Sequence, residues 1–201
     1  MRERGRPRAF DVDVALDRAI EVFWRYGYDG ATMAMLTEAM GINKPSLYAA
    51  FGNKEQLFKA AVRRYATVDM LYARRALEQP TAQAVVSTLL NDNIRAVTDP
   101  SRPPGCLSIQ GAIATGPESA ELTRFVAASR LSGEAALASR FERAVAEGDL
   151  PADADPAALA RYVMIVTEGQ AVHASGGVSR ADLEASARYA LDAFSALVGQ
   201  S

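Results

Sequence analysis

The polar residues that could do chemistry in this chain gather in one short segment, GINKPSLYAAFGNKEQLF. Leu47 and Phe51 are four residues apart, so they would occupy one side of a short helix and bury it. Lys44, Pro45, Ser46, Tyr48 and Ala49 then remain available to a partner, and they include a cation and two hydroxyl groups. The end of such a helix can meet base edges while flanking donors hold phosphates. The segment therefore predicts a helix that lies against DNA.

The elements that must position this helix are themselves helical. Apolar residues recur at helical spacing along nearly the whole chain, and strand alternation never persists. Breaks such as DPSRPPG, TGPES, EGDLPADADP and SGGVS separate the helical segments. We predict an all-α protein with a helix-turn-helix domain over residues 1–52 and a helical domain over residues 53–201. About nine helices are expected, over 13–26, 32–40, 44–50, 53–80, 82–98, 107–115, 118–147, 156–174 and 180–198.

The first three expected helices have the outline of a helix-turn-helix. Thr32 can cap the second helix and Asn43 the third, while Gly41 supplies the turn between them. Pro45 falls in the first turn of the third helix, where its missing N–H has no intrahelical partner to lose. The helix starts at Thr32 and Asn53 add backbone N–H groups that attract phosphate.

The charge distribution indicates a basic module on an acidic body. The net charge of −2 by itself argues against nucleic acid. Residues 1–65, however, carry 11 Lys/Arg against 8 Asp/Glu, whereas residues 66–201 carry 11 against 16. Arg4, Arg6 and Arg8 lie in RGRPR, and arginines on a stiff extended arm suit the narrow minor groove. We expect them to contact DNA, with a solvated tail as the alternative.

Composition argues against several other classes of protein. An apolar share of 49% is typical of a globular chain and not of a disordered one. No apolar run approaches the roughly 18–20 residues of a membrane span, and no apolar segment follows the basic start as in a secretory signal. A single cysteine excludes an intramolecular disulfide framework. We expect a cytoplasmic protein with no membrane partner.

The segment TMAMLTEAMGINKPSLYAAFGNKEQLF resembles the DNA-binding domain of the TetR/AcrR family of transcriptional regulators. The similarity covers the turn, the recognition helix and the start of the fourth helix. Phe23 and Trp24, followed by YGYDG, are similar to the exit of the family's first helix. The match is close over about residues 10–65, and beyond them only the number and lengths of the helices match. The resemblance implies a ligand-binding and dimerisation domain behind the DNA-binding domain.

The resemblance also implies which residues touch DNA. Thr32, Tyr48 and Lys54 would anchor phosphates, and residues 44–46 would lie nearest the bases. Family members often have glycine where this chain has Pro45, so the operator sequence does not follow from the resemblance. Together with the basic arm, the candidate DNA contacts are Arg4, Arg6, Arg8, Thr32, Asn43, Lys44, Pro45, Ser46, Tyr48, Ala49 and Lys54.

Three residues of the second domain are candidate ligand contacts. Met164 and Glu168 would lie one turn apart on a helix and could line a cavity, although a polar helix surface explains them equally well. Cys106 would open a helix, either as a buried structural thiol or as a redox or electrophile sensor. Neither it nor His173 has a partner at an informative spacing, so we expect no catalysis, no metal and no cofactor.

These features together predict a ligand-responsive, one-component transcriptional repressor that binds a palindromic operator as a dimer. The resemblance implies double-stranded operator DNA and an unidentified small-molecule effector as partners. It also places the homodimer interface on the last two helices. Their apolar stripes fit either that interface or the core of one protomer: Leu159, Val163, Val166, Leu183, Ala187, Leu191 and Phe194. The alternatives are a transcriptional activator and a redox or electrophile sensor acting through Cys106.

Overall fold

The computed structural model describes residues 10–113 and 120–199, and every regular element in these ranges is a helix. The all-α prediction is therefore confirmed. Ten helices lie within the described ranges: α1 (Val12–Gly30), α2 (Met33–Met40), α3 (Lys44–Phe51), α4 (Lys54–Val68), α5 (Leu71–Leu77), α6 (Ala82–Val97), α7 (Leu107–Ile113), α8 (Ala120–Ala146), α9 (Pro156–Ser175) and α10 (Arg180–Val198).

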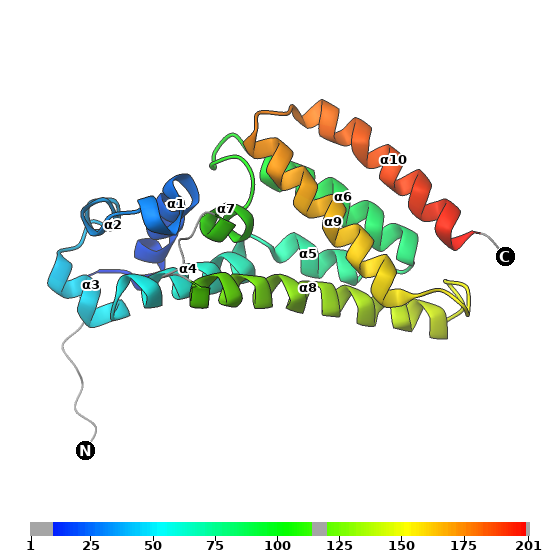
Figure 1. Cartoon of the computed structure of the whole chain (residues 1–201), viewed down its shortest axis with the longest axis horizontal. Coiled ribbons are helices and arrows are strands. Elements are labelled where there is room, and N and C mark those ends of the chain that lie inside the picture. The colour runs from blue at the N-terminus through cyan, green and yellow to red at the C-terminus, as the bar shows by residue number, and fades with distance from the viewer. Residues whose placement is uncertain (1–9, 114–119, 200–201) are drawn as a thin grey trace, which may run out of the picture.

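The molecule is elongated, with α1, α2 and α3 together at one end (Figure 1). Helix α4 leads from this end toward the centre, where it contacts α1, α7 and α8. Helices α6, α9 and α10 pack on one another at the other end, and α8 runs along much of the molecule and packs against α9. Helix α7 contacts both α1 and α9, so it joins the two ends.

Side-chain caps determine where the first helices begin. The Thr32 Oγ1 accepts the Met35 N–H at 3.2 Å at the start of α2. The Asn43 Oδ1 accepts the Ser46 N–H at 2.8 Å at the start of α3. Between these two helices Gly41 has φ 67° and ψ 29°, a left-handed conformation that glycine adopts without strain. The predicted caps and turn are confirmed.

The predicted fourth helix is wrong in length, because the structure divides it into α4 and α5. The break falls at Asp69 and Met70, where the sequence has neither glycine nor proline. The Asp69 carboxylate is paired with Arg102, whose Nη2 lies 2.6 Å from Asp69 Oδ1. This contact comes from the loop that follows α6, so a long-range interaction accompanies the end of α4.

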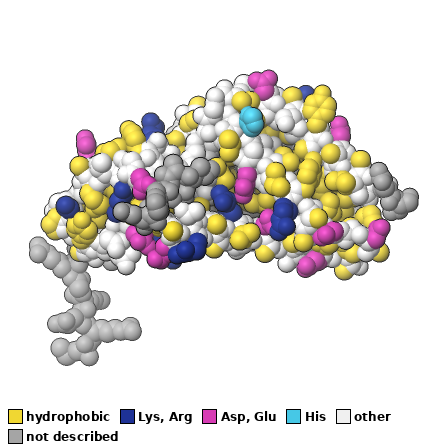
Figure 2. Space-filling model, viewed as in Figure 1, with side chains coloured by type: hydrophobic (Ala, Val, Ile, Leu, Met, Phe, Trp, Pro, Cys, Tyr) yellow, Lys and Arg dark blue, Asp and Glu magenta, His cyan; other side chains and the backbone are white. Residues whose placement is uncertain are grey.

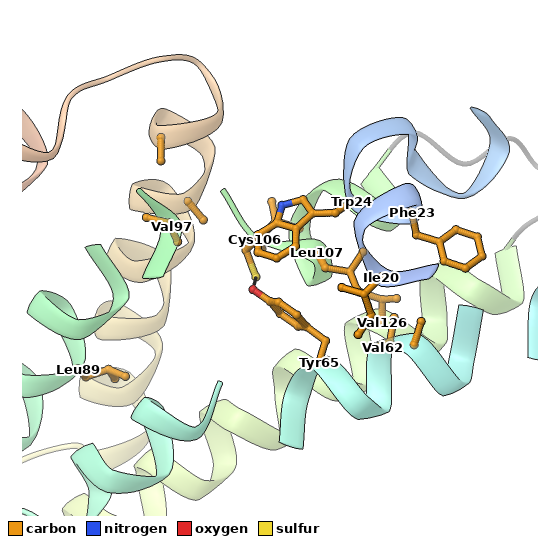
Figure 3. Packing of buried hydrophobic residues seen from close by; sticks show 14 of the residues in the cluster. Ile20, Phe23, Trp24, Val62, Tyr65, Leu89, Val97, Cys106, Leu107 and Val126 are labelled. Carbon is orange, nitrogen blue, oxygen red and sulfur yellow. Dashed lines mark hydrogen bonds between the residues drawn. The ribbon is translucent and has the colours of Figure 1, made fainter. Parts of the chain in front are cut away.

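Aromatic side chains build the core at both ends of the molecule. The Phe58 ring meets Phe23 and Tyr28 edge-on, with centroid distances of 5.0 and 5.3 Å. Phe141 and Phe194 pack together at the other end, 5.7 Å apart. All four phenylalanines are fully buried. Between these clusters, Figure 3 shows Trp24 of α1 reaching toward Tyr65 of α4 and Cys106.

The apolar stripes of α9 and α10 mostly serve the core of one protomer. Val163, Leu183, Ala187 and Phe194 are buried within the chain, whereas Leu159, Val166 and Leu191 are partly buried. A different set of large apolar side chains on these helices is exposed: Ile165, Val172, Tyr189 and Leu197. Of the two explanations that the sequence left open, the core accounts for four of the seven stripe residues.

Candidate DNA-binding face and regulatory cavity

Helix α3 turns one side inward and presents the other to solvent. Leu47 is fully buried and holds the helix against its neighbours. Lys44, Pro45, Tyr48 and Ala49 are all exposed. The Lys44 Nζ lies 5.9 Å from the centroid of the Tyr48 ring. We call this outward side, defined by residues 44, 45, 48 and 49, the α3 face.

Two helix N-termini flank the α3 face in the sequence. Thr32 caps α2 and is exposed. Asn53 caps α4 in a capping box, in which Asn53 Oδ1 accepts the Gln56 N–H at 2.8 Å and Gln56 Oε1 accepts the Asn53 N–H at 3.2 Å. The remaining N–H groups of each first turn have no acceptor within the helix, so they suit an anion such as phosphate.

Lys54 is in an unfavourable position for its own helix. It stands in the first turn of α4, where the helix dipole disfavours a cation. Partial burial also lowers its pKa, although Asp29 acts in the opposite direction. Its Nζ lies 4.5 Å from the centroid of the Tyr28 ring, a contact with the π face that holds the ammonium in place. An external anion would stabilise this charge.

The other predicted DNA contacts differ in how far the structure leaves them available. Asn43 is exposed, but its side-chain oxygen is already used as the α3 cap. Ser46 is only partly exposed. Arg4, Arg6 and Arg8 lie outside the described residues.

Helix α4 is tied to α1 by charge as well as by packing. Arg64 donates from Nε to Asp17 Oδ1 at 2.6 Å and from Nη2 to Asp17 Oδ2 at 2.8 Å, a two-pronged geometry that fixes both side chains. The hydrogen bond from Arg64 is the main cause of a lowered pKa at Asp17. The third Arg64 nitrogen, Nη1, lies 3.1 Å from Asp13 Oδ1. These contacts join α4 to α1 directly.

A cavity lies between α4 and the helices that follow it. Its larger compartment has a volume of about 460 Å³, and its smaller compartment about 80 Å³. The two compartments share wall residues from α4, the α4–α5 junction, α6, α8 and α9: Ala66, Met70, Asn93, Ser129, Gly133, Met164 and Thr167. Apolar side chains dominate the walls of the larger compartment, as in sites for small organic molecules.

Buried polar groups on the cavity wall are bonded mainly to one another. Asn93 Oδ1 accepts the Tyr72 hydroxyl at 2.8 Å, and Asn93 Nδ2 donates to Gln170 Oε1 at 2.7 Å and to the Thr167 carbonyl at 3.0 Å. This network links α5, α6 and α9. Because the amide of Asn93 has partners on both sides, it is held rigidly on the wall.

The structure brings all three predicted ligand contacts to the smaller compartment. Cys106, Met164 and Glu168 line its walls. Arg130 faces Glu168 across it, with Arg130 Nε 3.7 Å from Glu168 Oε1. Cys106 is buried, and its Sγ lies 2.9 Å from Ser108 Oγ. His173, by contrast, is exposed on α9.

Sequence reasoning missed the residues that join the cavity to the DNA-binding end. Tyr65 is not among the residues singled out above, yet its hydroxyl donates to Cys106 Sγ at 3.4 Å (Figure 3). Trp24 is named above only for the family resemblance. Its ring packs edge-on against Tyr65 at 5.1 Å, and its Nε1 donates to Gln110 of α7 at 2.8 Å. The sequence offered one signal for Tyr65, a phenol among the apolar residues of the fourth helix.

Two further features of the described residues concern metal ligands and membrane spans. No three His, Cys, Asp or Glu side chains in residues 10–113 and 120–199 come together as a metal site. None of the described helices combines the length and apolar character of a bilayer span.

Comparison with known proteins agrees with this arrangement. Residues 15–61 match the model of the bacterial regulatory proteins of the tetR family, and residues 82–193 match the tetracyclin repressor-like C-terminal domain. The HTH-type transcriptional repressor ComR of Escherichia coli K12 is 32% identical over 89% of this chain and 86% of its own length. The HTH-type regulator YezE of Bacillus subtilis 168 is 35% identical over 79% and 83%.

A solved structure is similar over almost the whole chain. The TetR family regulator CifR, as a double cysteine mutant in complex with a 26-base-pair operator DNA, is 42% identical with a TM-score of 0.90. The similarity covers 94% of this chain and 99% of that one. The family predicted from the recognition segment is confirmed: the chain belongs to the TetR family of transcriptional regulators, and it is a TetR-type repressor rather than an enzyme.

Proposed function

We propose that this repressor binds a palindromic operator as a homodimer through its two α3 faces, and that a small molecule in the cavity releases it. The observation that carries the proposal is the α3 face itself. Lys44 and Tyr48 are exposed beside each other on a helix that is anchored to the core by the fully buried Leu47. A helix held in this way can enter the major groove without disturbing the core.

The flanking groups supply the affinity that does not depend on base sequence. The N-termini of α2 and α4, together with Lys54, would grip phosphates on either side of the groove. Residues 44–46 would then meet the bases. The basic arm with Arg4, Arg6 and Arg8 is proposed to add contacts in the minor groove. Binding of the 26-base-pair operator by CifR supports this mode of action. Since operator DNA lies in the cytoplasm, we place the protein there.

A dimer is proposed because a single recognition helix buries too little surface for tight operator binding. The exposed apolar side chains Ile165, Val172, Tyr189 and Leu197 supply the matching surface on α9 and α10. Ile165 and Val172 are seven residues apart, so they share one side of α9. Apolar side chains are prominent over this end in the space-filling view (Figure 2). Two-fold pairing across such a surface gives a symmetric dimer.

Release by an effector requires that the effector bind the DNA-free conformation better than the DNA-bound one. A hundredfold loss of operator affinity corresponds to about 2.7 kcal/mol of coupling. The route proposed here runs from the cavity through Tyr65 to Trp24, and from α4 to α1 through Arg64 and Asp17. Movement of α4 would change the spacing of the two α3 faces.

A second mode of control has one specific observation in its favour. Cys106 lines the smaller compartment and lies within contact of Tyr65 and Ser108. An oxidant or electrophile that enters the cavity could reach this thiol. Cys106→Ser tests this mode: unchanged operator release by peroxide or by a quinone would exclude thiol sensing.

A gel shift at physiological salt tests the proposal as a whole. The probe is the intergenic DNA upstream of the protein's own gene, and random duplex is the competitor. We expect a preference for the intergenic probe and a single complex of dimer stoichiometry. Equal affinity for random duplex would contradict the proposal. A reporter gene under the same DNA separates the repressor from an activator, because only an activator raises expression.

The salt dependence of binding tests the proposed role of Lys54 at a phosphate. Lys54→Gln should flatten the plot of log affinity against log salt by about 0.9 for each phosphate that the variant no longer neutralises. Lys59→Gln is the matched control, because Lys59 is committed to Glu55 and Glu121, each 2.7 Å away. An equal change in slope for both variants would contradict a phosphate contact at Lys54.

A further inference from the structure

The smaller compartment of the cavity contains a hydrogen-bond donor with a poor partner. The Tyr65 hydroxyl donates to Cys106 Sγ at 3.4 Å, and sulfur is a weak acceptor. The tyrosine is buried, with an exposed fraction of 5%. Burial raises the pKa of Tyr65 well above its usual value, so the phenol keeps its proton. A better acceptor placed in this compartment would compete with the sulfur for the hydroxyl.

The charges on the wall argue against an ionic ligand. Arg130 and Glu168 face each other, so the net charge they present is zero. Arg74, on the larger compartment, is exposed to water. The inner wall beside Tyr65 consists of neutral groups such as Cys106 and Ser108. An anion or cation placed there would lose its hydration without gaining an opposite charge.

The position of Tyr65 connects this compartment to the DNA-binding end. Its ring touches Trp24 of α1 edge-on at 5.1 Å, and it belongs to α4, the helix that follows α3 (Figure 3). A ligand that moves the Tyr65 ring away from Cys106 would therefore disturb the contact between α4 and α1. A ligand that attracts the hydroxyl thus acts on the junction that positions the α3 face.

We propose that the effector is a neutral molecule with an apolar body and an acceptor oxygen, and that this oxygen takes the Tyr65 hydroxyl from Cys106. The apolar body occupies the larger compartment of about 460 Å³, where Met70, Leu89 and Leu137 form part of the wall. The oxygen occupies the smaller compartment, which has room for a polar group of a few atoms. This inference rests on the proposed control by a small molecule and specifies its chemistry.

Calorimetric titration of the full chain with three probes tests the inference. The probes are 2-octanone, its hydrocarbon counterpart 2-methyl-1-octene, and octanoate as the anion. Tyr65→Phe removes only the hydroxyl. The comparison is made between wild type and variant for each probe, so the different hydration of the probes cancels. We expect Tyr65→Phe to lower the affinity for the ketone about five- to tenfold and to keep the affinity for the alkene within about twofold of wild type.

Two variants serve as controls for the position of the donor. Tyr72→Phe removes a phenol on the same cavity that is already bonded to Asn93, so it should change ketone and alkene binding alike. Cys106→Ala removes the competing sulfur, so ketone affinity should be kept or raised. Melting curves of each variant establish that it is folded. If Tyr65→Phe fails to fold, binding of the ketone and the alkene to Cys106→Ala still tests the inference.

The inference is overturned if Tyr65→Phe weakens both neutral probes equally, or if Cys106→Ala abolishes ketone binding. It is also overturned if octanoate binds more tightly than the ketone, or if none of the probes binds. Operator binding without any probe is measured separately by gel shift. If the protein binds its operator but Tyr65→Phe does not distinguish the ketone from the alkene, only the proposed ligand class is contradicted. If the protein does not prefer its operator, the proposed function is contradicted.

Discussion

The two ends of the molecule use their buried space in opposite ways. At the DNA-binding end, Phe23, Tyr28 and Phe58 pack edge-on or stacked around fully buried positions. At the regulatory end, the helices around Asn93 and Met164 enclose a cavity of about 460 Å³. A packed end holds the α3 face in one geometry, while a hollow end can bind a ligand. The contact between Trp24 and Tyr65 joins the two.

The largest expected effect is a difference in stability between two variants, one at each end of the molecule. Phe58→Ala should lower the free energy of unfolding by about 3–5 kcal/mol, since the ring is fully buried among other rings that cannot close the void. Met164→Ala should cost about 1 kcal/mol or less, because this partly exposed side chain already borders empty space. Denaturation in urea measures both. Equal destabilisation of the two variants would contradict the difference in packing.

A matched pair of glycines sharpens the comparison. A Cβ at Gly111 would lie 3.0 Å from Leu107 Cδ1 and 3.3 Å from two atoms of the Phe58 ring, so Gly111→Ala should destabilise by about 1 kcal/mol. A Cβ at Gly133 would meet only Met164 Cε at 3.9 Å. Gly133→Ala should therefore stabilise α8 by about 0.5–1 kcal/mol. Thermal melts measure both changes: the melting temperature should fall for Gly111→Ala and rise for Gly133→Ala. Shifts in the same direction would contradict the predicted difference in packing.

The smallest expected effect concerns the ion pair that ties α4 to α1. Arg64→Gln should cost at most about 1 kcal/mol at pH 7, since Asp17 is partly exposed and water screens the pair. Arg64 lowers the folded-state pKa of Asp17 below its ordinary value of 3.8. The stabilisation is therefore complete above about that pH and is lost as the pH falls through the folded-state pKa.

Urea denaturation of wild type and Arg64→Gln at pH 7 and at pH values below 4 measures this effect. The gap between the two proteins should close in acid. A gap that stays constant across this range would mean that Arg64 stabilises the fold by packing alone.

The sequence predicts the DNA-binding end well because local rules decide it. Thr32 and Asn43 cap helices by hydrogen bonds to residues three positions ahead, and Gly41 adopts the left-handed turn. The spacing of Leu47 and Phe51 predicts the inward side of α3, where Leu47 is buried and Phe51 partly buried. Each of these signals lies within a few residues of the structure it specifies.

The regulatory end could be predicted only in part, because distant residues decide it. Helix α4 ends at Val68 without a local breaker, and the partner of Asp69 is Arg102. The acceptor of the Tyr65 hydroxyl is Cys106, 41 residues further along the chain. Met164, a candidate ligand contact, lies on the wall of the cavity, and its role as a ligand contact stays a prediction. Periodicity marks which residues turn inward, but not which of them leave space.

Fluorescence anisotropy with labelled operator DNA tests the central claim most directly. Tyr48 on the α3 face and Tyr26 on α1 are both exposed tyrosines of the DNA-binding end, at 43% and 54%. If the α3 face meets DNA, Tyr48→Phe weakens operator binding about tenfold or more, since both subunits lose a hydrogen bond to phosphate. Tyr26→Phe should leave the affinity within about twofold. Unchanged affinity in Tyr48→Phe, or an equal loss in both variants, would contradict the account.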